Sequence, residues 1–234
     1  YIFVLPSTII VDADGNGHFT TIQDAIDNAT AGNTIRVWAG TYNEDLEIDK
    51  MLTLIGNGTT SSIINGTGTS NTDAVKITAD WVNLSGFKIQ NSGRNGIFIE
   101  DSDHVTISGN NIIDSGDGSP DAGIYLSSSD SNTISGNTIT GSTDDGIYLT
   151  GSDSNTISNN TLSDNEDYDI YLTSGSNDNI FIGSVSDVYV SSNSDLTIKN
   201  YLTIQVKLSD DLINGSDIQL KDNGDVLYAT SYYN

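Results

Sequence analysis

Gly123-Ile-Tyr-Leu126, Gly146-Ile-Tyr-Leu149 and Asp169-Ile-Tyr-Leu172 repeat one pattern at an interval of 23 residues. A fixed period of this length is typical of a solenoid, in which each repeat forms one coil and is stable only when stacked on its neighbours. A second repeated segment precedes each copy: Ile107-Ser-Gly-Asn-Asn-Ile112, Ile134-Ser-Gly-Asn-Thr-Ile139 and Ile157-Ser-Asn-Asn-Thr-Leu162. The insertion Gly116-Asp-Gly-Ser-Pro120 lengthens only the first of these repeats.

Each repeat holds three short segments in which apolar and polar residues alternate, separated by Gly, Asn, Asp and Ser. That is too little chain for units of strand and helix, so the repeat predicts three parallel sheets wound into a coil, with neighbouring strands about 4.8 Å apart. The alternation predicts four inward stacks: Ile107/Ile134/Ile157, Ile112/Ile139/Leu162, Ile124/Ile147/Ile170 and Leu126/Leu149/Leu172.

Asparagines recur at one bend of the repeat, at Asn110, Asn137 and Asn160. Asparagine tolerates the left-handed backbone that a tight bend needs. Stacked side-chain amides can also donate and accept hydrogen bonds along the axis of the coil. We therefore expect a row of asparagines at this bend, in the left-handed conformation.

Two domains are predicted. Residues 1–200 should form the β-helix, capped by a short helix over residues 21–28, where Thr21 and Asp24 have capping-box spacing. We expect the regular coils to begin at about residue 60. Residues 201–234 should form a partial β-sandwich-like module or a strand-donor segment, because strands at 203–208, 217–220 and 226–228 are separated by Asn-Gly turns.

The composition is strongly acidic: 8 Lys and Arg against 32 Asp and Glu give a net charge of −24. Nucleic acid is excluded as a partner, because phosphate binding needs clustered cations. Tyr-Ile-Phe-Val-Leu at the start is too short to span a membrane, so no membrane insertion is expected in this segment.

The chain has no Cys. It has N-x-Ser/Thr glycosylation sequons at Asn28, Asn57, Asn65, Asn83, Asn159 and Asn214, which favour an extracellular or cell-surface location.

The segment that ends at Gly58 resembles the N-terminal region of pectin methylesterases. The resemblance rests on Val11-Asp-Ala-Asp-Gly-Asn-Gly-His-Phe-Thr-Thr-Ile-Gln-Asp-Ala-Ile26, Ala39-Gly-Thr-Tyr-Asn-Glu44 and Leu54-Ile-Gly-Asn-Gly58. The later repeats look like NosD-type repeats of the pectate-lyase superfamily. The resemblance implies a right-handed parallel β-helix of the pectin lyase-like superfamily, a fold that carries esterases, lyases, hydrolases, epimerases and non-catalytic surface proteins.

Catalytic residues of these families are hard to find in the chain. Pectin methylesterases imply an aspartate-bearing Phe-Ile-Phe-Gly-Asn-Ala stretch and a Leu-Gly-Arg-Pro-Trp motif, and both are absent. A lyase of this superfamily implies a Lys or Arg base near carboxylates that bind Ca²⁺. Arg94, which aligns with Asp121 in the next repeat, is the best candidate for that base. The alternative is a surface arginine that pairs with a neighbouring carboxylate.

Two further catalytic patterns are weaker. Asn71-Thr-Asp73 and Asp144-Asp145 match polygalacturonase-like motifs, but they lie about three coils apart instead of one, so we interpret the match as coincidence. His104 is interpreted as a turn residue that aligns with Trp81. The two histidines are too few and too separated for an evident metal cluster.

Stacked in register, the repeats form an aromatic row on the outer surface, flanked by two rows of carboxylates. The aromatic row is Phe98, Tyr125, Tyr148, Tyr171 and Tyr189. The carboxylate rows are Asp80, Asp103, Asp130 and Asp153 after that strand, and Asp121, Asp144 and Asp167 before it. The tyrosines either stack on one another or form a surface for carbohydrate or a partner protein. The carboxylates are either screened by salt or bind Ca²⁺.

Two functions follow from these patterns. The first is a non-catalytic extracellular or cell-surface β-helix that acts as a rigid stalk, or as a surface that binds polysaccharide or neighbouring protein subunits. The alternative is a lyase or epimerase that acts on acidic polysaccharides, although the net charge of −24 opposes a polyanionic substrate. Neither function requires a cofactor, and Ca²⁺ is the predicted ion.

Overall fold

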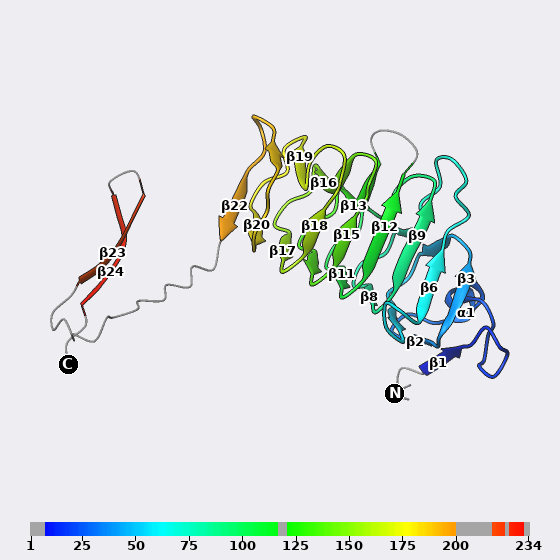
Figure 1. Ribbon diagram of the computed structural model, residues 1–234. Helices are drawn as coiled ribbons and strands as arrows, with labels where there is room; N and C mark the ends of the chain where they lie inside the picture. The colour runs from blue at the N-terminus through cyan, green and yellow to red at the C-terminus, as the bar shows by residue number, and fades with distance from the viewer. Residues whose placement is uncertain (1–7, 117–120, 200–216, 223–224, 232–234) are drawn as a thin grey trace. The chain divides into compact units, whose positions relative to one another are not determined.

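The computed structural model describes residues 8–116, 121–199, 217–222 and 225–231. The chain divides into two compact units, residues 1–200 and 201–234. The first unit is a right-handed parallel β-helix (Figure 1). Each coil contributes a strand to each of three parallel sheets in turn.

The three sheets have nine, six and seven strands. The nine-stranded sheet consists of β1 (Thr8–Val11), β2 (Thr34–Val37), β5 (Thr53–Gly56), β8 (Asn83–Ser85), β11 (Thr106–Ser108), β14 (Thr133–Ser135), β17 (Thr156–Ser158), β20 (Asn179–Ile182) and β22 (Leu196–Lys199). The six-stranded sheet consists of β3 (Gly40–Asn43), β6 (Ser62–Asn65), β9 (Lys88–Ser92), β12 (Asn111–Ser115), β15 (Thr138–Thr140) and β18 (Thr161–Ser163). The seven-stranded sheet consists of β4 (Leu46–Ile48), β7 (Val75–Ile77), β10 (Ile97–Glu100), β13 (Ala122–Ser127), β16 (Asp145–Thr150), β19 (Ile170–Thr173) and β21 (Val188–Val190).

The coils begin earlier than the sequence suggested. β2, β3 and β4 already form a full coil at residues 34–48, so the expectation that regular coils start at about residue 60 is wrong. Irregular spacing hides the early coils. β2 pairs with β5 so that Ile35 lies opposite Leu54, and this interval is shorter than the one between the later repeats.

Helix α1 (Ile22–Asn28) closes the N-terminal end of the coil. Thr21 caps it by accepting a hydrogen bond from the Asp24 backbone N–H, as predicted, and Ile22 and Ile26 on its inner face are buried. The carboxylate of Glu44 accepts hydrogen bonds from the N–H groups of Ile22 and Gln23 at 2.8 and 2.9 Å. Glu44 therefore binds the positive end of the helix and joins it to the first coil.

The predicted inward stacks form the core. Ile107, Ile134 and Ile157 are fully buried and directly paired from coil to coil, and the other predicted stacks are buried as well except Leu162, which is partly exposed. Burying such a side chain stabilises the fold by roughly 1.5–3 kcal/mol. Because every coil adds the same set, the interior is one continuous apolar column.

The glycine of the Gly-Ile-Tyr-Leu pattern is required for packing. A Cβ on Gly123 would overlap the Ile139 Cγ2 methyl group and approach the Gly146 carbonyl oxygen at 2.8 Å. The backbone of Gly123 is outside the left-handed region. At Gly123 the pattern therefore reflects the close approach of β13 to β15 and β16, which leaves no space for a side chain, whereas the third copy has Asp169 at this position.

The predicted asparagine row exists and is a hydrogen-bond ladder. Asn137 is buried, its Oδ1 accepts from the Asn110 backbone N–H at 3.0 Å, and its Nδ2 donates to the Ile107 carbonyl at 2.9 Å. The expected left-handed backbone is wrong at these positions. The residue before each asparagine has the positive φ instead, as at Gly136 (64°) and Asn159 (54°).

A second asparagine ladder was missed from the sequence. Asn132, Asn155 and Asn179 lie at the bend between the seven- and nine-stranded sheets, where Oδ1 of Asn155 accepts from the Asn132 N–H at 2.8 Å. A row of buried serines runs beside it, in which Ser129 donates its backbone N–H to Ser152 Oγ at 3.1 Å. These ladders satisfy backbone groups that the bends leave without strand partners.

The second unit contains β23 (Asp217–Asp222) and β24 (Asp225–Ser231), which pair antiparallel. The strand predicted at 203–208 lies outside the described residues. Within the described part of the chain, no helix is long and apolar enough to cross a membrane.

Candidate functional site

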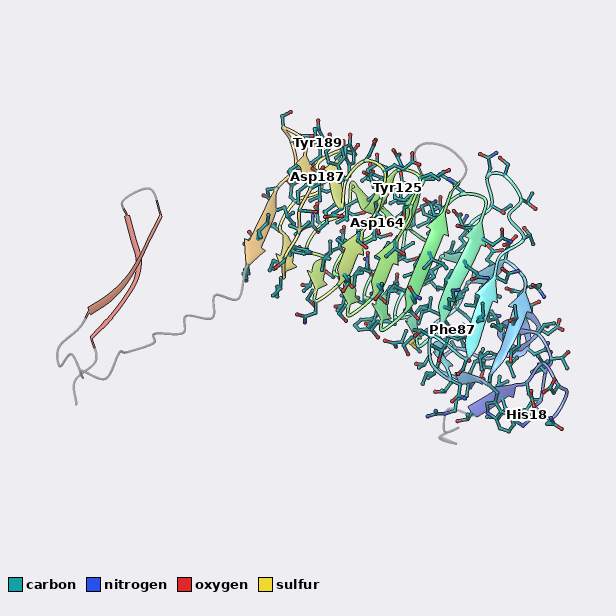
Figure 2. The ribbon with its side chains drawn as sticks, viewed as in Figure 1. His18, Phe87, Tyr125, Asp164, Asp187 and Tyr189 are labelled. Atoms are coloured by element: carbon teal, nitrogen blue, oxygen red, sulfur yellow. The ribbon has the colours of Figure 1, made fainter. Side chains whose placement is uncertain are left out.

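The outer face of the seven-stranded sheet carries the predicted aromatic row. Strand register places Phe98 opposite Tyr125, and then Tyr148, Tyr171 and Tyr189 in order. Successive ring centroids are 5.1, 4.6, 5.0 and 4.6 Å apart. Figure 2 labels Tyr125 and Tyr189, which lie along the upper side of the coil in that view. We call this set the tyrosine row.

The rings of the tyrosine row cover one another. Tyr125 and Tyr148 stack at an interplanar angle of 7°, Tyr171 and Tyr189 stack at 11°, and Tyr148 meets Tyr171 edge to face at 79°. Tyr168 adds a sixth ring, 5.7 Å from Tyr171. Stacked faces are shielded by their neighbours, so the row mainly presents ring edges and hydroxyl groups to solvent. Of the two interpretations offered by the sequence, mutual stacking of the tyrosines agrees with these ring contacts.

Burial makes the hydroxyls of Tyr125, Tyr148 and Tyr171 harder to ionise, because it raises the pKa of each. Burial, with a smaller contribution from the neighbouring Tyr125 and Tyr171, raises the pKa of Tyr148 to about 12. Burial also raises the pKa of Tyr125 and Tyr171. These three tyrosines therefore present neutral hydroxyls, which can both donate and accept hydrogen bonds.

Phe98 differs from the tyrosines, because two cations cover it. Lys76 Nζ lies 5.7 Å and Arg94 Cζ 5.3 Å from the centroid of its ring, and only 6% of Phe98 is exposed. Lys76 also pairs with Glu100 at 2.8 Å. The expectation of an outward-facing Phe98 is correct for its strand position, but its ring is not open to solvent.

A groove of about 700 Å³ begins at this end of the tyrosine row. It lies over β4, β7 and β10, beside α1 and the segment before β7. Its lining residues are Gln23, Asp27, Asp45, Leu46, Glu47, Asn71, Thr72, Asp73, Lys76, Arg94, Phe98 and Glu100. The groove therefore joins Arg94, Phe98 and Asp73, which the sequence analysis considered only separately, and adds Lys76.

Arg94 is a partly exposed cation in the groove. In the described part of the chain its guanidinium forms no ion pair or hydrogen bond, although it stacks on Phe98. A guanidinium with unused donors is suited to bind an oxygen-rich ligand. No observation shows Arg94 acting as a base, so that role stays a prediction.

Asp73 lies deeper in the same groove. Its Oδ1 accepts hydrogen bonds from the Asn95 backbone N–H at 3.1 Å and from Asn95 Nδ2 at 2.7 Å. Burial raises the pKa of Asp73, and the bonds from Asn95 oppose that increase. The sequence analysis interpreted the motif match at Asp73 as coincidence. The contact between Asp73 and Asn95 could not be predicted, because it depends on how neighbouring coils align.

The first carboxylate row forms hydrogen bonds along the axis. Asp80, Asp103 and Asp130 each accept from the backbone N–H of the next aspartate, at 2.8, 2.7 and 2.7 Å, and Asp153 accepts from Asn177 at 2.7 Å. Each carboxylate thus satisfies a backbone donor at a corner, which offsets part of the repulsion within the row.

The second carboxylate row is not a surface ladder, contrary to expectation. Asp121 is 6% and Asp144 is 8% exposed, and Asp167 alone of the three is exposed. The adjacent Asp145 is also buried. Its pKa rises to about 7, first because of burial and then because of Asp144.

Within the described residues, neither carboxylate row forms a cluster of metal ligands. Among the residues that the structure describes, no three His, Cys, Asp or Glu side chains gather closely enough to hold a metal ion. Calcium at either carboxylate row therefore stays a prediction.

Comparison with known proteins identifies the family. The family model described as "Right handed beta helix region" matches residues 63–231, which is more than half of the chain. The chain therefore belongs to this right-handed β-helix family. A pectinesterase family model matches residues 8–93, the part that carries the pectin methylesterase resemblance.

Individual relatives match only parts of the chain. A cell surface glycoprotein of Methanothermus fervidus is 43% identical over 96 residues, which cover 40% of this chain and 16% of the relative. Pectinesterase 1 of Citrus sinensis is 39% identical over 70 residues, covering 27% of this chain and 12% of the relative. The match therefore spans less than a fifth of either curated relative.

Among solved structures, an alginate lyase from Paenibacillus is similar in fold. It superposes with a TM-score of 0.55 at 20% identity, covering 83% of this chain and 75% of that chain. At this identity the likeness concerns the fold alone.

Proposed function

We propose that the chain is a β-helix module of a cell-surface protein, in which the coil is a rigid spacer and the tyrosine row with its groove contacts carbohydrate. The observation that carries the proposal is the continuity of the tyrosine row with the groove at Arg94 and Phe98. A spacer alone needs only the internal ladders and the core. An outer row of tyrosines that continues through Phe98 into a groove with a guanidinium is suited to the hydroxyl-rich surface of a glycan.

The relatives support the location. The cell surface glycoprotein of Methanothermus fervidus shares 43% identity with part of this chain. The axial ladders support the spacer role, because each coil is tied to the next through side chains as well as through strand pairing. The proposed binding surface lies outside these ladders, so binding and rigidity involve different residues.

Binding is tested with purified protein on immobilised polygalacturonate, alginate and a neutral glucan. We expect retention on at least one polymer, weakened about tenfold by Arg94→Ala, the order of effect found at binding hot spots. Lys88→Ala is the matched control, since Lys88 is a cation outside the groove. Retention that is equal for all three proteins, or absent for the wild type, contradicts the proposed binding surface.

Polysaccharide cleavage is the second candidate function. The observation that favours it is the presence of Arg94, Lys76 and Asp73 in one groove, with the pKa of Asp73 raised by burial. Incubation with polygalacturonate or alginate, with and without calcium, tests it through the ultraviolet absorbance of unsaturated products. Product formation that Arg94→Ala abolishes supports a lyase. An epimerase produces no such signal and requires NMR of the polymer.

A further inference from the structure

The five glycosylation sequons within the described residues differ in how their side chains are engaged. A sequon requires both an asparagine amide and a hydroxyl two residues later, on a surface accessible to the transferring enzyme. The structure shows whether each amide and each hydroxyl is already bonded to the protein. On this criterion the five sequons separate into two groups. The sixth, Asn214, lies outside the described residues.

The first group has both side chains engaged. Asn28 donates from Nδ2 to the Asp24 carbonyl at 2.8 Å, and the hydroxyl of its sequon, Thr30 Oγ1, donates to Asn33 Oδ1 at 3.2 Å. Asn65 is only partly exposed and donates from Nδ2 to Asn43 Oδ1 at 2.7 Å.

The Asn65 amide belongs to a longer row on the six-stranded sheet. Its Oδ1 accepts from Gln90 Nε2 at 3.0 Å, and Thr67 Oγ1 donates to Asp45 Oδ2. A sugar on Asn65 would crowd Asn43, whose Oδ1 lies 2.7 Å from the nitrogen that would carry the sugar. The conflict is the same whether the sugar is transferred before or after folding.

The second group has neither side chain engaged. Asn57, Asn83 and Asn159 are exposed. Within the described residues, neither their amides nor the hydroxyls of Thr59, Ser85 and Thr161 take part in a hydrogen bond, because the bonds at these positions come from the backbone. Asn159 also lies at a corner of the coil, with φ of 54°, and it is exposed.

The second group gathers on one side of the coil. Asn83 is the first residue of β8, whereas Asn57 and Asn159 lie at corners directly after β5 and β17, so all three lie in or next to strands of the nine-stranded sheet. The outer positions of this sheet are mostly small and hydroxylated, as at Thr106, Thr133 and Thr156. The tyrosine row lies on a different sheet.

We infer that N-linked glycans attach at Asn57, Asn83 and Asn159 and coat the nine-stranded face, and that Asn28, Asn65 and the tyrosine row stay bare. The inference rests on the proposed cell-surface location. In the transfer, Nδ2 forms a C–N bond with the anomeric carbon of a sugar carried on an isoprenoid diphosphate. The C–O bond to the diphosphate breaks, the diphosphate leaves with the electron pair, and the amide loses one proton. The coil then has a glycosylated face along the nine-stranded sheet and a contact face at the tyrosine row.

The test is site occupancy in the full chain, secreted from an N-glycosylating host with an unstructured reporter sequon appended to the chain. Peptide mass spectrometry after enzymatic glycan release should show occupancy at Asn57, Asn83 and Asn159 and none at Asn28 or Asn65. Thr59→Ala, Ser85→Ala and Thr161→Ala should each remove one glycan. These changes leave every asparagine in place, including the left-handed Asn159.

The matched controls are Thr30→Ala and Thr67→Ala, which should remove none. Occupancy at Asn28 or Asn65 equal to that of the other three overturns the inference. The inference is also overturned if Asn57, Asn83 and Asn159 carry no glycan while the reporter sequon is glycosylated. Carbohydrate binding is measured separately, on protein from a host that does not glycosylate it. The two proposals can therefore fail independently: missing glycans would not contradict carbohydrate binding, and missing binding would not contradict the glycosylation sites.

Discussion

Single side chains maintain the connection between coils, and Asn137 shows how much one of them contributes. It is 1% exposed, it receives the Asn110 N–H, and it donates to the Ile107 carbonyl. Asn137→Ala should leave both groups buried without partners, at a cost of about 1–3 kcal/mol for each. Urea unfolding measures the loss. Thr138→Ala, on the adjacent exposed position, should change the free energy of unfolding by less than about 0.5 kcal/mol.

Asp145 should make stability depend on pH. Its pKa is about 7 in the folded chain against an ordinary 3.8, so the folded state holds its proton more tightly between these values. Stability should therefore fall as pH rises from about 4 to about 7. Asp145→Asn keeps an acceptor for the Tyr168 N–H, and it should raise the free energy of unfolding at pH 8 by about 1–3 kcal/mol with little effect at pH 4. Equal effects at both pH values would show that Asp145 ionises normally.

The tyrosine hydroxyls and the tyrosine rings should have separable effects. Tyr148→Phe keeps the stacking with Tyr125 and Tyr171 and should leave stability nearly unchanged, because its hydroxyl forms no hydrogen bond to the described residues. Tyr148→Ala should cost roughly 1–3 kcal/mol through lost ring contacts. Thermal unfolding measures the stability of both variants, and glycan retention measures binding. Binding that survives both changes would make the row purely structural.

At the scale of the element, Gly123 within β13 and Gly136 at a corner of the coil represent two kinds of glycine. Gly123→Ala should destabilise by about 1–3 kcal/mol, because its Cβ would overlap Ile139. Gly136 has φ of 64° and open space around it, and Asn159 occupies the equivalent corner one coil later. Gly136→Asn should therefore be nearly neutral in chemical denaturation. A larger loss for Gly136→Asn than for Gly123→Ala would contradict this assignment.

Strands were predictable as elements because their alternation repeats in every coil. The inward stacks follow from that period alone, and the structure buries them as expected apart from the partial exposure of Leu162. The early coils were not predictable, because the separation between β2 and β5 departs from the period of the later repeats. The second asparagine ladder has a signal in the sequence that the prediction did not use, since Asn132 and Asn155 both precede a Thr-Ile-Ser strand at the same interval as the other repeats.

At the scale of the whole molecule, the charge of −24 should make stability depend on salt. Added NaCl should raise the melting temperature, because it screens carboxylates that repel one another along the coil. Calcium at matched ionic strength tests the predicted ion sites. A further increase with calcium that magnesium does not reproduce supports specific sites, and an identical melting curve for the two salts rules against them.

The sequence by itself determined the coil, its core and the alignment of the tyrosine row, because strict side-chain alternation and a constant repeat length fix register between neighbouring coils. Only the tertiary structure decided what surrounds each aligned side chain. It placed Phe98 beneath Arg94 and Lys76, buried Asp121 and Asp144, and divided the sequons into engaged and open groups. The physical reason is that burial and hydrogen bonding at the corners depend on contacts between segments one coil apart, across turns whose paths the repeat does not specify.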